Sequence, residues 1–190
     1  IIIVVLICLN GVFALAEMAM VSAKKNRIRA LAEQGNKSAE AAMRLKEDPK
    51  AFLSTVQVGM TLIGVLAGAF AGATLAEEIR KALELIPGLK TQAGAISVGL
   101  VVAVVTYLSL IVGELVPKQI ALGYPEKMAL VIARPMESRS KVSKPLVWLL
   151  GKSSALLLGI LGIKSVDEGK LTEEDIKLVL QEGSESGLLE

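Results

Sequence analysis

Three stretches of this chain are each long and apolar enough to cross a lipid bilayer as a helix. They cover residues 1–23, 51–76 and 93–116, and about 20 apolar residues suffice to span the hydrocarbon core. A soluble domain of 190 residues with only 3% aromatic residues could not bury so much apolar surface. The sequence therefore predicts an all-α membrane protein with three transmembrane helices.

Residue counts exclude several classes of function. The chain has no histidine and one cysteine, Cys8, so histidine-based catalytic triads, imidazole metal sites and thiolate clusters within one chain are ruled out. A formal net charge of +2 lacks the basic excess of a protein that binds nucleic acid. No phosphate-binding loop or hydrolase motif is visible, so we do not expect an enzyme.

The distribution of charge predicts how the chain is oriented in the membrane. Residues 24–50 hold eight Lys or Arg against four acids, and basic residues return after residue 117. Under the positive-inside rule the loop expected at 24–50 and the segment after residue 117 are cytoplasmic, which leaves the N-terminus outside and the C-terminus in the cytoplasm. The balanced loop expected at 77–90, with its Pro87–Gly88 turn, suits the outer side.

Residues 1–165 are predicted to form the transmembrane module, with short juxtamembrane helices at about 124–163. Residues 146–163 are apolar but are interrupted by Lys152, which favours an interfacial or re-entrant segment over a fourth span. The polar run 137–144 leaves the form of the juxtamembrane helices open. Residues 166–190 are predicted to form an acidic helical segment, because Thr172 can cap a helix whose first turn is acidic.

The sharpest candidate for chemistry is Glu114, near the end of the third span, since an ionisable side chain there is usually paired or functional. Pro117 has no amide proton to offer the carbonyl of Gly113, four residues earlier. A carbonyl oxygen beside a carboxylate suits a hard cation. Pairing of Glu114 with Lys118, one turn on, explains the position equally well.

Two further polar residues share a face of the first span. Asn10 and Glu17 are seven residues apart, close to two helical turns. Asn10 could instead make a hydrogen bond between helices, and Glu17 could pair with a basic residue on another helix.

In the second span, Gly64 lies on a small-residue face with Gly68 and Gly72, which permits close approach of another helix. Together the spans favour a cation site lined by oxygen atoms.

Three motifs, in this order along the chain, resemble the CorC/CNNM family of magnesium transporters: Leu9–Ser22, Ser54–Gly64 and Gly113–Lys118. The resemblance implies a homodimeric membrane module with three spans per subunit, which exports Mg²⁺ in exchange for Na⁺. It also implies that residues after 165 lead to a cytosolic CBS-pair domain that binds ATP and is absent from this sequence.

The resemblance also implies which residues hold the ion. Glu114 corresponds to the acidic residue of the third-span motif, with Gly113 beside it, Asn10 to the polar position of the first motif, and Gly64 to the second-span position. Glu17, which is Asn in eukaryotic relatives, is a candidate for Na⁺ coupling. A Mg²⁺ sensor without transport activity, or a transporter of Mn²⁺ or Co²⁺, remains an alternative from the residues alone.

Overall fold

The computed structural model describes the backbone of residues 1–161 and the side chains of residues 1–137, 148, 149 and 151–161. Within this range there is no β-strand. The elements are α1 (Ile2–Ser22), α2 (Lys25–Glu33), α3 (Lys37–Glu47), α4 (Pro49–Glu84), α5 (Ala93–Leu110), the π-helical segment η1 (Ile111–Leu115), α6 (Val116–Gly123) and α7 (Pro125–Ile160). Contacts divide the chain into a unit of residues 1–147 and a second unit that begins at residue 148, so the fold below is that of the first.

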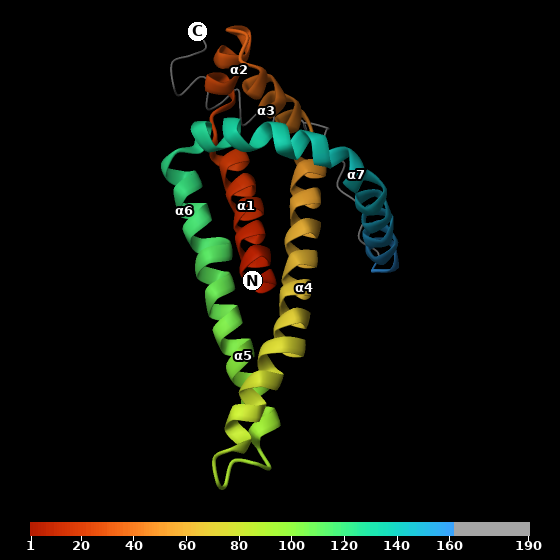
Figure 1. Ribbon diagram of the computed structural model, residues 1–190. Helices are drawn as coiled ribbons and strands as arrows, with labels where there is room; N and C mark the ends of the chain where they lie inside the picture. The colour runs from red at the N-terminus through yellow and green to blue at the C-terminus, as the bar shows by residue number, and fades with distance from the viewer. Residues whose placement is uncertain (162–190) are drawn as a thin grey trace, which may run out of the picture. The chain divides into compact units, whose positions relative to one another are not determined.

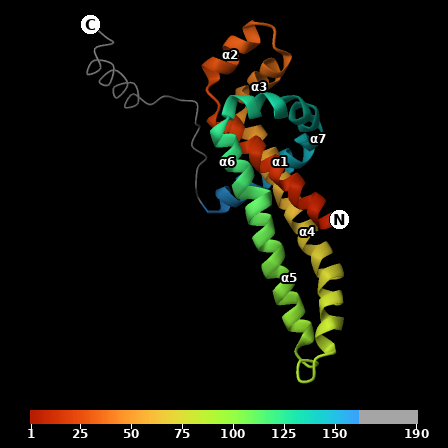
Figure 2. The same cartoon turned by 60° about the vertical axis from the view of Figure 1, so that its left-hand side comes forward.

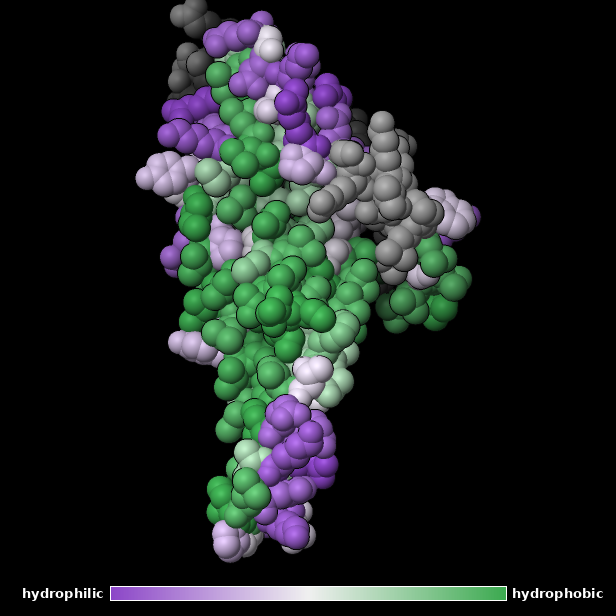
Figure 3. All heavy atoms as spheres, in the orientation of Figure 1, coloured by the Kyte–Doolittle hydropathy of each residue, from purple (hydrophilic) through white to green (hydrophobic). Residues whose placement is uncertain are grey.

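Three helical segments of this unit are long and apolar enough to cross a membrane: α1, α4, and the continuous run Ala93–Gly123 formed by α5, η1 and α6. The prediction of an all-α membrane protein with three spans is thereby confirmed. The first charged residue of α1 is Glu17, which lies within the last two turns of the helix. The apolar band and the polar ends of the unit are visible in Figure 3.

Two of the spans continue beyond the limits expected from the sequence. The 36 residues of α4 rise about 54 Å at ~1.5 Å per residue, against a hydrocarbon core of about 30 Å. Its last turns, expected as a loop from residue 77, stay helical because Arg80 pairs with Glu77 and Glu84 along the helix. The third run passes Pro117 and ends at Gly123, since proline is tolerated in the first turn of a helix.

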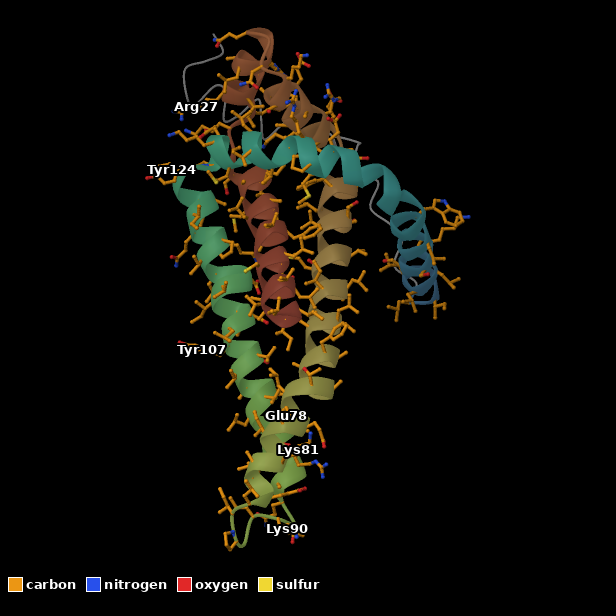
Figure 4. All side chains as sticks on the ribbon, in the orientation of Figure 1. Arg27, Glu78, Lys81, Lys90, Tyr107 and Tyr124 are labelled. Carbon is orange, nitrogen blue, oxygen red and sulfur yellow. The ribbon has the colours of Figure 1, made fainter. Side chains whose placement is uncertain are left out.

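Helix α1 lies between the other two spans. It packs against α4 on one side and against η1 and α6 on the other, while α4 and α5 pair with each other (Figures 1 and 2). The α4–α5 pair closes in a short turn in which Gly88 has a φ of +95°, a conformation open to glycine. Glu78, Lys81 and Lys90 lie toward this end, whereas Arg27 and Tyr124 lie at the opposite end (Figure 4).

The basic segment expected as a loop at residues 24–50 contains the helices α2 and α3. Asn36 caps α3 by accepting hydrogen bonds from the backbone N–H groups of Ser38 and Ala39. Gly35, with a φ of +82°, ends α2 in a Schellman arrangement in which the Asn36 N–H donates to the carbonyl of Leu31. The segment 24–50 is therefore helical, and we call α2 and α3 together the helical cap.

The main hydrophobic core of the unit lies where this cap packs against the other helices. The core joins the end of α1, the start of α4, the helices α2, α3 and α6, and the first part of α7. Its buried residues are mainly small, among them Ala39, Ala41, Ala42, Ala129 and Ala133, each fully buried. Ion pairs from Arg27 to Glu126 and from Arg44 to Glu137 join the cap helices to α7 at its surface. Both basic segments therefore lie at the same end of the unit. This agrees with the expectation that they lie on one side of the membrane.

The predicted short juxtamembrane helices at 124–163 correspond to the single helix α7 over Pro125–Ile160. The run 137–144, which contains neither glycine nor proline, does not interrupt it. Helix α7 is not among the three candidate spans. The predicted acidic helical segment 166–190 lies outside the described residues.

Two glycines allow α1 to approach its neighbours closely. A Cβ atom on Gly11 would lie 2.9 Å from the carbonyl oxygen of Val112 and 3.0 Å from Cγ of Pro117. A Cβ on Gly59 of α4 would lie 2.8 Å from the ring of Phe13. The glycine face at 64, 68 and 72 behaves differently, because a Cβ at any of these positions meets nothing within 4 Å. Among the described glycines, Gly11 and Gly59 would make the tightest contacts, and a Cβ on Gly113 would lie 3.3 Å from Nδ2 of Asn10.

Replacement of Gly11 by alanine should therefore destabilise the protein. Alanine is the better helix former by up to ~1 kcal/mol, but the contact with backbone of η1 cannot relax cheaply, and overpacking costs roughly 1–3 kcal/mol. We expect Gly11→Ala to lower the Tm in detergent. The matched control is Gly99→Ala in α5, where the new Cβ enters open space and the Tm should stay constant or rise. Equal Tm values for the two variants would contradict this packing.

Candidate functional site

The π-helical segment η1 is a direct consequence of Pro117. Proline has no N–H to give the carbonyl of Gly113, so the regular α-helical bond is lost at this point. The backbone widens by one residue, and the N–H of Val116 donates to the carbonyl of Ile111, five residues earlier. Such single-turn π-bulges are frequent at functional sites in helices. The sequence predicted the missing bond but not the π-helical geometry.

The carbonyl of Gly113 is satisfied from another helix. Nδ2 of Asn10, on α1, donates to it at 3.0 Å. The hydrogen bond between helices considered for Asn10 is therefore present, and it is made to the carbonyl released by Pro117. Its own carbonyl oxygen, Oδ1, is buried and has no hydrogen-bond partner among the described residues. A buried polar atom without a partner usually requires a specific explanation.

Glu114 and Glu17 share a single cation. The ammonium of Lys118 lies 2.8 Å from Oε1 of Glu114, one helical turn away, and 3.7 Å from Oε2 of Glu17 on α1. The side chains of Glu17 and Lys118 are 26% exposed and that of Glu114 is 42% exposed. Both pairings considered as alternatives in the sequence are thus present. Two carboxylates around one ammonium leave an excess of one acidic group between α1 and the third span.

Gly64 does not reach this cluster in the described chain. It is exposed on α4, and a Cβ added to it would meet nothing within 4 Å. Two hydroxyl-bearing residues of these spans, Thr61 on α4 and Thr106 on α5, are also exposed, and Thr61 donates to the carbonyl of Gln57 in its own helix. Four of the five candidate residues, Asn10, Glu17, Gly113 and Glu114, lie at the contact of α1 with η1 and α6.

Two residues of the site were not recognised as such from the sequence. Lys118 was considered only as a partner of Glu114, and its contact with Glu17 depends on the packing of α1 beside α6. Gly11 follows Asn10 and makes room for the backbone of η1; its place in the first motif was the only available signal.

Among the described residues no group of three or more His, Cys, Asp or Glu is placed to hold a metal. The oxygen donors here are an amide, a backbone carbonyl and two carboxylates.

The fold and this cluster define an integral membrane protein with three spans and a polar contact between the first and the third. Residues 1–190 match the sequence model of the CNNM family, described as the Cyclin M transmembrane N-terminal domain. The chain therefore belongs to this family, as its three motifs predicted. Membership suggests a function in membrane ion transport or a related process.

Curated relatives match nearly all of the chain. UPF0053 protein sll0260 of Synechocystis is 45% identical over 98% of this chain and 42% of its own length. UPF0053 protein YhdT of Bacillus subtilis is 32% identical over 96% of this chain and 40% of its own length. A protein of Haemophilus influenzae named polyamine export protein is 30% identical over 98% of this chain and 43% of its own length. The chain thus spans less than half the length of these three relatives.

The distances around Lys118 predict that its coupling free energy with Glu114 is larger than that with Glu17. In double-mutant cycles with Lys118→Met, Glu114→Gln should show a coupling of roughly 1 kcal/mol and Glu17→Gln a smaller one, since partly exposed pairs are weakened by solvent. Thermal unfolding in detergent measures both. The control cycle pairs Lys81→Met with Glu78→Gln, whose side chains are 58% and 73% exposed, and its coupling should be near zero. Stronger coupling to Glu17 than to Glu114 would contradict the geometry.

Proposed function

We propose that this chain is the membrane module of a cation transporter and that its cargo is Mg²⁺, exported in exchange for Na⁺. The single observation that carries the proposal is the buried, unpartnered Oδ1 of Asn10 beside the carbonyl of Gly113. A neutral oxygen left without a donor inside a membrane protein is costly. A cation would supply the missing partner.

The chemistry of the donors supports a hard cation. Mg²⁺ prefers oxygen ligands in an octahedron and usually keeps several waters, with one or two carboxylates from the protein. Asn10, Glu114 and Glu17 provide one amide oxygen and two carboxylates within the same contact between helices. Because Lys118 pairs with both carboxylates, a bound metal would compete with its ammonium. We assign the metal-binding role to Asn10 and Glu114, and Na⁺ coupling to Glu17.

The remaining parts of the proposal follow the family resemblance. We propose a homodimer with the N-terminus outside and the C-terminus in the cytoplasm, in which residues after 165 lead to an ATP-binding CBS-pair domain. The uncovered face of α4 at Gly64 and Gly68 offers a surface for the second subunit. In this scheme Gly64 approaches the ion only in the dimer, and no enzymatic role is assigned.

Loss of the Glu114 carboxylate should abolish Mg²⁺ flux. We expect Glu114→Gln, which keeps the shape of the side chain, to reduce Mg²⁺ transport by proteoliposomes to the background of empty vesicles under an imposed Na⁺ gradient. The control is Glu78→Gln, at the far end of α4, with unchanged flux. Size-exclusion chromatography should give the same elution volume for both variants. Full transport by Glu114→Gln would refute the assigned site.

A second candidate cargo is a polyamine, and the position of Lys118 favours it. Its side chain is an alkylammonium ion held by two carboxylates, which is the same chemistry as one end of a polyamine. The relative from Haemophilus influenzae carries the name polyamine export protein. Competition in the same vesicles separates the two cargoes: Mg²⁺ flux that is insensitive to excess spermidine, with no spermidine uptake, excludes the polyamine.

Two other outcomes of the flux assay decide the remaining alternatives. Equal transport of Mn²⁺ or Co²⁺ would indicate a less selective transporter of divalent ions, since several of them accept oxygen ligands. Binding of Mg²⁺ by the purified protein without any flux would indicate a sensor that regulates a partner.

A further inference from the structure

A second candidate binding site lies away from the cation site, where α1, α3 and α4 meet. A cavity of about 320 Å³ opens at the end of α1 and α3 and the start of α4. Six of its eight lining residues are apolar and two are lysines: Met20, Val21, Leu45, Pro49, Phe52, Leu53, Lys25 and Lys46. Its lining combines an apolar wall with a concentrated positive charge.

The cavity lies at the boundary between the membrane and the basic cap. The spans α1 and α4 end and begin at Ser22 and Pro49, so their adjoining turns lie at the depth of lipid headgroups on the side of α2 and α3. Met20 and Phe52 are buried, whereas Val21 is 62% exposed. The apolar wall is therefore continuous with the surface of α1 that faces lipid.

The two lysines have unused capacity for an anion. Nζ of Lys46 donates to the carbonyl of Ala23 at 2.7 Å, and an ammonium group carries two more N–H donors. Neither Lys25 nor Lys46 pairs with a carboxylate in the described part of the chain. Burial, followed by the positive charge of Lys25, lowers the pKa of Lys46 below its ordinary value. A negative group between the lysines would relieve this repulsion.

We propose that this cavity binds one anionic phospholipid, with the phosphate between Lys25 and Lys46 and the upper part of the acyl chains against the apolar wall. At ~30 Å³ for a water-sized group, the cavity of about 320 Å³ accommodates about ten such groups, which is the size of a glycerophosphate, and the acyl chains would continue along the exposed apolar surface beside Val21. A soluble anion would leave the six apolar residues unused. Anionic lipids are attracted to basic segments at this depth, and the bound lipid would tie α3 to the two spans.

The test compares lipids bound to the purified full-length protein by native mass spectrometry in detergent. The probes are phosphatidylglycerol, phosphatidylcholine and glycerol 3-phosphate. We expect one phosphatidylglycerol per chain and at least tenfold weaker binding of the other two. Lys25→Gln removes an exposed charge and should weaken phosphatidylglycerol binding about fivefold, which corresponds to ~1 kcal/mol for one lysine at the membrane surface.

The matched control is Lys24→Gln, which removes the same charge from the neighbouring exposed residue outside the cavity. Its affinity for phosphatidylglycerol should change less than twofold. Equal losses in the two variants would reduce the effect to general surface charge and overturn the site. Equal binding of phosphatidylcholine would overturn the role of the lysines, and equal binding of glycerol 3-phosphate would assign the cavity to a soluble anion. Loss of the lipid on dimerisation would assign it to a second copy of the chain.

Discussion

The amide proton that Pro117 lacks determines the structure around it. Without that donor, the third span cannot remain a regular α-helix at Gly113, and it widens into η1. The released carbonyl is then satisfied by Asn10 from α1, which requires the two backbones to lie close together. Gly11 and Gly113 make this approach possible, because a Cβ on either would press against the opposite helix. One missing N–H thus explains a π-bulge, two glycines and a buried amide.

The main hydrophobic core and the candidate site lie in different parts of the first unit. The hydrophobic core lies in the cap, where α2, α3 and α7 bury small residues against the ends of the spans. The spans themselves expose most of their apolar side chains, as expected of surfaces that face lipid. The cap therefore holds the ends of α1 and α4 in place, while the contact of α1 with η1 is left to polar bonds and close backbone packing.

Hydrophobicity and local motifs predicted much of this arrangement. Long apolar runs identify the three spans because a bilayer requires about 20 apolar residues, and Pro117 marks the irregular turn. The helical nature of residues 24–50 was missed, although Asn36 and Gly35 carry recognisable capping signals. The pairing of Lys118 with Glu17 was not predictable, since these residues are 101 positions apart and meet only through the order in which the spans pack. The exposure of Gly64 likewise depends on which face of α4 turns toward α1.

The ammonium of Lys118 places a constraint on any mechanism at this site. Carboxylates near a membrane interior are retained when they are paired, and Lys118 pairs with both Glu17 and Glu114. In the transporter proposed above, a cargo cation that uses these oxygens would compete with a charge that belongs to the protein, so it would displace the ammonium of Lys118 from the carboxylates. Release of the cargo would then restore the ion pairs. This competition would lower the cost of emptying the site and so favour turnover over tight binding.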